Sequence, residues 1–174
     1  MAISIDGYIA GPDEDISMFT ANGEGVRQYL KDLEAFDTVI MGRKTYEFGY
    51  KFGLEPGRLA YPHMKHVIFS SSLKFEHPDK GLRVTDLDLK VIEDLQEEEG
   101  SDIYLCGGGE LAGWLLEHEK IDLLKIKLNP IILGEGVPLF GRSVKPVHLE
   151  LQETASYDDG LQIITYQIKY SPEK

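Results

Sequence analysis

The chain has 174 residues, of which 42% are hydrophobic and 28% are charged, a balance typical of a globular protein with one sizeable core. Its formal net charge of −12 at pH 7 argues against a nucleic-acid partner, because surfaces that bind nucleic acids are basic. An anionic ligand would therefore have to be held by a local cluster of donors, since the field of the whole protein repels it.

The first predicted elements are a short strand, a turn at Asp6-Gly7 and a second extended piece that ends at Ala10. A helix with apolar residues at helical spacing follows between residues 22 and 33. An apolar strand over residues 37–42 then runs into Gly42-Arg43-Lys44-Thr45. Cations are unfavourable at a helix start, so a bound phosphate would explain this segment, and solvated surface charge is the alternative.

The next predicted strand covers residues 65–69 and ends at Ser70-Ser71-Ser72, with Lys74 close behind. The loop over residues 49–63 precedes it. Hydroxyl groups and a cation at a strand end are suited to a phosphate on a ribose, although a serine run is more often a plain polar loop. A short strand near residues 82–84 and a helix that begins at Leu89 complete this part.

The stretch around residues 103–116 reads as strand, glycine-rich turn and helix. Ile103 to Leu105 favour a strand, and Gly107-Gly108-Gly109 leads directly into the helix. Glycines allow positive φ and let a ligand approach the backbone, and the first turn of a helix offers unpaired N–H groups to an anion. A tight corner without a ligand is an equally good explanation of the glycines alone.

The remaining chain predicts an alternating strand over residues 121–128 and a hairpin around the turn at residues 157–160. Helices alternate with apolar strands from residue 22 to residue 128. This pattern predicts an α/β fold: a mixed, mostly parallel sheet with helices on both faces and a C-terminal antiparallel hairpin. We expect a single domain over residues 1–171.

All three candidate anion sites follow the carboxyl ends of strands, which is where ligands bind in open α/β sheets. Three phosphate-type sites along one rim describe a dinucleotide with an additional phosphate, which is NADP rather than NAD. A non-catalytic nucleotide-binding protein is the alternative from another class. A third reading is an α/β domain in which all three corners are only turns.

The single cysteine, Cys106, excludes an internal disulfide and favours a reducing compartment. It stands just before the glycines, and a buried small hydrophobe is favoured there over a reactive thiol. The histidines show no metal-ligand spacing, and no stretch approaches the roughly 18 apolar residues that span a bilayer. We expect a cytoplasmic protein without a metal or a membrane partner.

The order of these motifs resembles the dihydrofolate-reductase-like superfamily. Within it, the chain is most similar to stand-alone relatives of the reductase domain of the bifunctional riboflavin-biosynthesis deaminase-reductase. The motifs that carry the likeness are Asp6 to Ala10, Met41 to Thr45, Ser70 to Ser72, Gly107 to Leu111, and Ile121-Asp122 through Pro130 to Gly136 with Leu139-Phe140. Together they cover nearly the whole chain.

The resemblance implies a three-layer α/β fold and an NADPH-dependent reductase of a heterocyclic small molecule, similar to 5-amino-6-(5-phosphoribosylamino)uracil reductase. An activity like that of dihydrofolate reductase is the alternative. Those enzymes carry an acidic residue in the first helix, where this chain has Val26 or Arg27. The arginines and the aspartate of the riboflavin-pathway substrate site have no confident match between residues 49 and 63, where Arg58 is the only arginine.

The resemblance also implies roles for individual positions. The implied cofactor-binding residues are Ala2, Ile9 and Ala10 at the nicotinamide; Gly42, Arg43, Lys44 and Thr45 at the phosphates; Ser70 and Ser71, with Ser72 beside them, at the adenosine ribose and its 2′-phosphate; and Gly107, Gly108, Gly109, Glu110 and Leu111 at the pyrophosphate.

The proton donor is open from the sequence alone. Asp6 is a catalytic candidate, and a carboxylate that stabilises the turn is at least as good an interpretation of it. The other candidates are Tyr8, Tyr46, Glu47 and His63. Two half-exposed strands with alternating apolar faces lead us to expect a homodimer.

Overall fold

The computed structural model describes residues 1–170, so Ser171, the last residue of the predicted domain, lies outside the described part. Contacts within the chain group it into two compact units. One contains Met1–Lys31 and the chain from Gly109 onward, and the other is Asp32–Gly108. The single domain over residues 1–171 stays a prediction.

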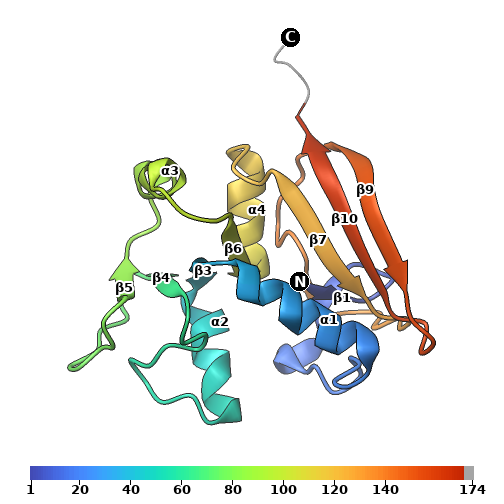
Figure 1. Cartoon of the computed structure of the whole chain (residues 1–174), viewed down its shortest axis with the longest axis horizontal. Helices are drawn as coiled ribbons and strands as arrows, with labels where there is room; N and C mark the ends of the chain where they lie inside the picture. Colours follow the sequence, from blue (N-terminus) through green and yellow to red (C-terminus); the bar gives the residue numbers. More distant parts are fainter. Residues whose placement is uncertain (171–174) are drawn as a thin grey trace. The chain divides into compact units, whose positions relative to one another are not determined.

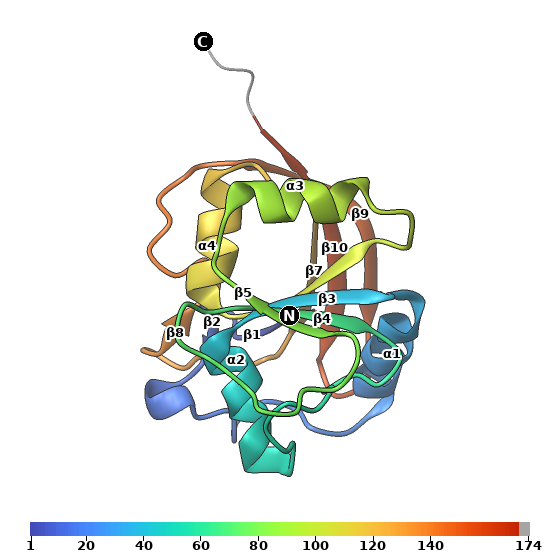
Figure 2. The ribbon, with the colours of Figure 1, turned by 90° about the vertical axis from the view of Figure 1, so that its left-hand side faces the viewer.

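The unit over residues 32–108 is built around a parallel four-stranded sheet in the order β5-β4-β3-β6. Helix α2 lies on one face of this sheet and α3 lies on the other (Figures 1 and 2). The predicted parallel sheet with helices on both faces is thereby confirmed. Its elements are η2 (Leu33–Ala35), β3 (Thr38–Gly42), α2 (Arg43–Phe48), η3 (Gly49–Phe52), β4 (Lys65–Phe69), β5 (Leu82–Thr85), α3 (Leu89–Glu97) and β6 (Ile103–Gly107).

The central strands of this sheet are apolar because both of their faces are covered. Val39 in β3 and Ile68 in β4 have no exposed surface. Helix α3 begins where the Asp88 side chain accepts a hydrogen bond from the Lys90 backbone N–H at 2.9 Å, which is a regular N-cap. Its residues Ile92 and Leu95 are buried, so the helix contributes one apolar stripe to the core.

The other unit holds a four-stranded sheet in the order β1-β7-β10-β9 and a separate antiparallel pair, β2-β8. Strand β1 is parallel to β7, whereas β7, β10 and β9 are antiparallel neighbours. The long hairpin of β9 and β10 in Figure 1 is the predicted C-terminal hairpin. The elements are β1 (Ala2–Ile3), β2 (Tyr8–Ala10), η1 (Pro12–Glu14), α1 (Glu24–Asp32), α4 (Gly109–Glu117), β7 (Leu123–Leu128), β8 (Val137–Pro138), β9 (His148–Ser156) and β10 (Gln162–Lys169).

Strand β9 is the edge strand of this sheet, and its side chains are far more exposed than those of β10. Ile164 and Ile168 of β10 are buried, as their alternation predicts, and Tyr166 is half-buried. By contrast, Leu149 and Leu151 of β9 are 45% and 56% exposed. The outer strand of the hairpin therefore carries apolar side chains that the described chain leaves uncovered.

Candidate functional site

The carboxyl ends of the parallel strands in the unit over residues 32–108 lie along one sheet edge. Strand pairing aligns Gly42 with Phe69, Met41 with Gly107, and Phe69 with Thr85. The segments that follow β3, β4 and β6 therefore start side by side, as the parallel order requires. The structure thus brings the residues after Gly42, those after Phe69, and Gly107-Gly108 to the same edge.

The corner between β3 and α2 is open at the backbone. A Cβ added to Gly42 would meet only the Gly108 backbone nitrogen, at 4.0 Å. A Cβ on Gly108 would come within 3.1 Å of the Thr45 Oγ1 atom. Gly42 and Gly108 therefore lie close together, with open space at the Cβ position of Gly42 and the Thr45 hydroxyl next to Gly108. The peptide bond between Gly107 and Gly108 is cis.

Two cations stand at this corner because α2 is firmly anchored on its inner side. Tyr46 is 1% exposed, and its hydroxyl donates to the Arg58 carbonyl at 2.7 Å. Arg43 and Lys44 are left on the solvent side of the helix. The Arg43 guanidinium lies 3.6 Å from the Glu47 carboxylate, a loose contact between partly exposed groups. Because α2 is only six residues long, attraction for an anion here rests on the two cations and Thr45.

The glycines between β6 and α4 have separate physical reasons. Gly107 has a φ of +139°, which favours glycine. In α4, a Cβ on Gly109 would overlap the Pro138 carbonyl oxygen, so close packing on β8 requires this glycine. Leu111 is 6% exposed and belongs to the core. Of this predicted segment, Gly108 is therefore partly exposed and Glu110 is exposed, whereas Gly107 is buried at the end of β6 and Gly109 is explained by packing.

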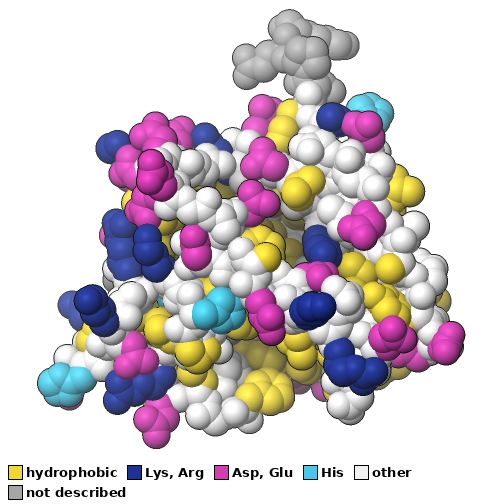
Figure 3. Space-filling model, viewed as in Figure 1, with side chains coloured by type: hydrophobic (Ala, Val, Ile, Leu, Met, Phe, Trp, Pro, Cys, Tyr) yellow, Lys and Arg dark blue, Asp and Glu magenta, His cyan; other side chains and the backbone are white. Residues whose placement is uncertain are grey.

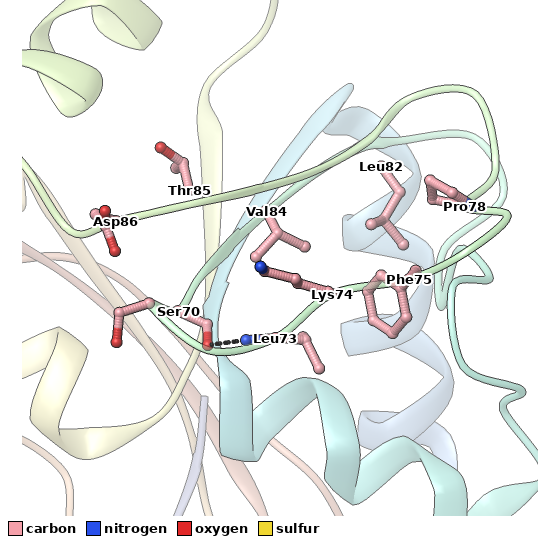
Figure 4. A pocket seen from close by; sticks show the side chains of 10 residues that line it. Ser70, Leu73, Lys74, Phe75, Pro78, Leu82, Val84, Thr85 and Asp86 are labelled. Carbon is pink, nitrogen blue, oxygen red and sulfur yellow. Dashed lines mark hydrogen bonds between the residues drawn. The ribbon is translucent and has the colours of Figure 1, made fainter.

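A hollow of about 470 Å³ lies after the end of β4 and along β5. Figure 4 shows an apolar end with Phe75, Pro78 and Leu82, a polar end with Ser70 and Asp86, and Lys74 reaching between them. The hollow is lined by Ser70, Ser71, Leu73, Lys74, Phe75, Pro78, Leu82, Val84, Thr85 and Asp86. A cation, hydroxyl groups and an apolar wall in one hollow are suited to a phosphorylated, flat ligand.

The serine run has a structural role in addition to any role in binding. The Ser70 Oγ accepts hydrogen bonds from the backbone N–H groups of Ser72 and Leu73, at 3.2 and 3.0 Å. Its hydroxyl proton stays available for a ligand. Ser71 lines the hollow, whereas Ser72 is absent from its lining. Lys74 is exposed and makes no hydrogen bond or ion pair with any residue between 1 and 170.

The sequence reasoning missed the wall contributed by β5. Thr85 pairs with Phe69, which places Thr85 and Asp86 next to Ser70. The available signal was the short apolar alternation of Leu82 and Val84, which predicts a strand but not its neighbour in the sheet. Asp86 matters chemically, because its carboxylate opposes an anion in the same hollow where Lys74 attracts one.

Asp6 holds a loop in place. Its carboxylate accepts hydrogen bonds from the backbone N–H groups of Leu133, at 3.1 Å, and Gly134, at 2.7 Å. A hydrogen bond from the Ser4 side chain and these backbone bonds keep the pKa of Asp6 below its usual value of 3.8. An ionised carboxylate has no proton to donate, so this geometry argues against Asp6 as the proton donor. A catalytic role for Asp6 stays a hypothesis without support from these contacts.

Two other candidate proton donors are also engaged. The Tyr46 hydroxyl is bound to the Arg58 carbonyl, and burial raises the pKa of Tyr46 above 10.0. The His63 Nε2 atom lies 3.2 Å from the Leu33 carbonyl oxygen. The Cys106 thiol lies 3.6 Å from the Tyr61 hydroxyl, and burial raises its pKa, which is unfavourable for a reactive thiolate.

The residues expected at the nicotinamide lie in the other unit, on β1 and β2. Ala2 pairs with Lys127 of β7, and Ala10 is 7% exposed while Ile9 is half-buried. Gly136 packs closely against the end of β2, since a Cβ there would overlap the Ala10 carbonyl oxygen. Ala2, Ile9 and Ala10 are thus small or apolar residues held by neighbouring strands, and their cofactor role stays a prediction.

Neither a metal cluster nor a membrane-spanning helix is found in the described chain. Between residues 1 and 170, no three His, Cys, Asp or Glu side chains gather closely enough to hold a metal ion. None of the helices in that range is both long and apolar enough to cross a bilayer. Acidic and basic side chains are interspersed on the face in Figure 3.

Solved structures with the same architecture define the class of fold. A putative riboflavin biosynthesis protein from Shewanella sp. PV-4 superposes with a TM-score of 0.78 at 25% identity, over 98% of this chain and 97% of that one. Dihydrofolate reductase from Enterococcus faecalis, solved in complex with NADP(H), superposes with a TM-score of 0.66 at 15% identity, over 97% and 94% of the two chains. The fold is that of the dihydrofolate-reductase-like proteins.

The sequence comparisons give the family. The chain is 31% identical over 172 residues to the uncharacterized protein YwjB of Bacillus subtilis (strain 168), covering 94% of this chain and 92% of that protein. The profile of the RibD C-terminal domain matches residues 1–163. The chain therefore belongs to the RibD C-terminal domain family, as its motifs indicated.

Proposed function

We propose that the protein is an NADPH-dependent reductase of a heterocyclic small molecule, similar to 5-amino-6-(5-phosphoribosylamino)uracil reductase of riboflavin biosynthesis. The observation that carries this proposal is the sheet edge where Gly42 and Gly108 lie close together next to the Thr45 hydroxyl, with Arg43 and Lys44 beside it. Membership of the RibD C-terminal domain family supports the riboflavin-type reaction. The Enterococcus neighbour's NADP(H) supports the cofactor.

The residues present fit a dinucleotide that carries two anionic groups, a pyrophosphate and a 2′-phosphate. Arg43, Lys44 and Thr45 would hold phosphate groups, and the partly exposed backbone of Gly108 would allow close approach. Ser70, Ser71 and Lys74 would hold the adenosine ribose and its 2′-phosphate in the hollow beyond β4. When bound, the reduced nicotinamide supplies the hydride, and the protein's own tasks are to bind, to orient and to provide a proton.

The cofactor proposal is tested by the binding of NADPH and NADH to the wild-type protein and to Arg43→Ala, measured by isothermal titration calorimetry. A charge-assisted hydrogen bond to phosphate contributes about 1.5–3 kcal/mol, so the variant should lose about tenfold or more in NADPH affinity. Its loss in NADH affinity should be similar, because NADH carries the same pyrophosphate, whereas Lys74→Ala should weaken NADPH more than NADH. Arg83→Ala removes the same charge from β5 without touching the hollow, and it should bind NADPH as the wild type does.

Equal affinity of the wild type for NADPH and NADH would contradict the 2′-phosphate assignment. Catalysis is tested separately by NADPH consumption with a panel of reduced-pyrimidine, pterin and quinone compounds. Binding of NADPH without turnover of any compound would favour a non-catalytic NADP-binding protein. Turnover of dihydrofolate alone would favour an activity like that of dihydrofolate reductase.

We also propose that the protein forms a homodimer through the edge strand β9. Its backbone groups on the outer side have no strand partner within residues 1–170, and Leu149 and Leu151 are exposed on it. An uncovered edge strand is a ready template for pairing with another chain. The expected cytoplasmic location stays a prediction.

A further inference from the structure

Lys127 of β7 is a half-buried lysine that has no carboxylate partner. Its Nζ atom donates to the Thr20 carbonyl at 3.3 Å and lies 5.9 Å from the centre of the Tyr29 ring. No Asp or Glu among residues 1–170 lies within 4.0 Å of it. An ammonium group has three N–H donors, and the Thr20 carbonyl accepts from only one of them. The Tyr29 ring is too distant to make up the difference.

Burial distinguishes Lys127 from Lys74, which also lacks a carboxylate partner but is exposed to water. The sequence has 30 Asp and Glu residues against 18 Lys and Arg residues. Other lysines that are more exposed find a carboxylate, as Lys90 does with Asp94 at 2.8 Å and Lys65 does with Glu98 at 3.2 Å. A charge that is partly removed from water without compensation costs free energy. A position that keeps a lysine under these conditions is suited to an anion from outside the chain.

The surroundings of Lys127 are rigidly built. Asn129, two residues further along the chain, is fully buried. Its Oδ1 atom accepts from the Thr20 backbone N–H at 3.0 Å, and its Nδ2 atom donates to the Lys127 carbonyl at 3.0 Å and the Ile3 carbonyl at 3.4 Å. One side chain therefore fixes the Thr20 loop, the Lys127 backbone and β1 together. Such preorganisation is expected of a binding position and lowers the entropy cost of binding.

The strand register places Lys127 beside the residue expected at the nicotinamide. Lys127 pairs directly with Ala2 of β1, so their side chains leave the sheet on the same face. Under the proposed function, a substrate that accepts the hydride must stack near Ala2. We propose that the Lys127 ammonium binds an anionic group of the substrate, a phosphate or a carboxylate carried by the heterocycle. This inference rests on the proposed function and deepens it.

The electrostatic state of the lysine agrees with this assignment. Burial lowers the pKa of Lys127 below its usual value of 10.5, because the charged form loses hydration. An anion beside the ammonium group would stabilise its charged form and so offset the hydration that burial removes. The uncharged variant Lys127→Met keeps an unbranched apolar side chain but loses the ammonium group and its hydrogen bond to the Thr20 carbonyl, whereas Lys127→Arg keeps the charge.

The test follows the lysine itself in the whole wild-type protein. With 13C-labelled lysines, the Lys127 side-chain resonance is assigned by its disappearance in Lys127→Arg. Two matched pairs of probes are then titrated: uridine 5′-monophosphate against uridine, and orotate against uracil. We expect the resonance to move with at least one anionic probe and to stay unchanged with its neutral partner. The responding pair identifies the anion as phosphate or carboxylate.

Calorimetry with the responding probe gives the size of the effect. A hydrogen bond to a charged group predicts about tenfold to a hundredfold weaker binding in Lys127→Met and a change of only a few fold in Lys127→Arg. The matched control is Lys125→Met, which removes the same charge from the same strand and should bind the probe as the wild type does. Affinity for NADPH should be unchanged in all three variants.

The inference is overturned if the Lys127 resonance ignores both anionic probes, or if it responds equally to their neutral partners. It is also overturned if Lys127→Met binds the responding probe as tightly as the wild type. The resonance test uses unmutated side chains, so it decides the question even where Lys127→Met fails to fold. If NADPH does not bind while Lys127 still responds to an anion, the proposed function fails and the anion site stands.

Discussion

At the scale of single residues, His66 shows how a buried polar group is satisfied without any part in a ligand site. The ring has no exposed surface. Its Nε2 atom accepts from the Tyr61 backbone N–H at 3.2 Å, so the Nδ1 atom carries the proton and donates to the Met64 carbonyl at 3.0 Å. Both ring nitrogens are thus used by the loop that precedes β4, and a second proton would meet the Tyr61 N–H.

His66 predicts a loss of stability in mild acid. Burial lowers the pKa of His66 below its usual value of 6.5. Below pH 6.5 the unfolded chain binds a proton that the folded protein excludes, so stability is complete above this pH and falls as the pH drops towards the folded-state pKa, by at most about 1.4 kcal/mol per pH unit. Urea unfolding at several values of pH between 7.5 and 5.5 measures this slope.

The dependence of the unfolding free energy on pH is due to His66 only if replacing His66 removes it. The variant His66→Gln should be less stable at pH 7.5 but show a flatter dependence of its unfolding free energy on pH. The exposed His77, changed to Gln, should leave the wild-type slope intact. A His66→Gln variant with the full wild-type slope would assign the acid sensitivity to other groups.

At the scale of elements, the two strand-to-helix corners look alike in sequence but differ in what their glycines do. The space next to Gly42 is empty of side chains, and its φ of −78° is one that any residue adopts. Gly109 instead packs against the Pro138 carbonyl and lies 3.1 Å, at the Cβ position, from the Gly141 nitrogen. One glycine therefore leaves room for a ligand, and the other allows two segments of the chain to touch.

Alanine at these two positions should separate binding from stability. In Gly109→Ala, the overlap with Pro138 forces the backbone to shift, and overpacking of this kind costs about 1–3 kcal/mol. In Gly42→Ala, the unfolding free energy should fall by less than about 1 kcal/mol, while affinity for NADPH should fall because the methyl group enters the open space. Denaturant unfolding and NADPH titration of both variants measure the contrast. Unchanged NADPH affinity in Gly42→Ala would argue that the cofactor does not approach this corner.

The elements themselves were largely predictable, because periodicity and glycine position are local signals. The apolar run through Val39 to Met41 and the alternation of Ile164 and Ile168 predicted β3 and β10. Contacts between distant segments were not predictable. Nothing near Gly109 in the sequence reveals Pro138, nothing near Asp6 reveals the N–H groups of Leu133 and Gly134, and nothing near Ser70 reveals Asp86.

At the scale of the whole molecule, the remaining question is what covers the outer edge of the β1-β7-β10-β9 sheet. Leu149 and Leu151 pair with Ile168 and Tyr166 of β10, so they extend an apolar stripe from the covered part of the sheet to its edge. Charged side chains protect many natural edges. Here Glu150 already pairs with Lys169 at 3.0 Å, and the two leucines remain uncovered.

A second copy of the chain would cover both the stripe and the unpaired backbone groups of β9, since an antiparallel pair of identical edge strands is compatible with a two-fold axis. Light scattering after size-exclusion chromatography should give twice the chain mass for the wild type. Leu151→Lys places a charge within the proposed contact, so it should shift the protein to the monomer without lowering its unfolding free energy by more than about 0.5 kcal/mol.

Val144→Lys adds the same charge at a residue that is 92% exposed and lies outside β9, and this control variant should remain dimeric. A wild-type protein that elutes with the mass of one chain at all concentrations would show that β9 is a tolerated free edge, and the apolar stripe would then have no partner in a second copy.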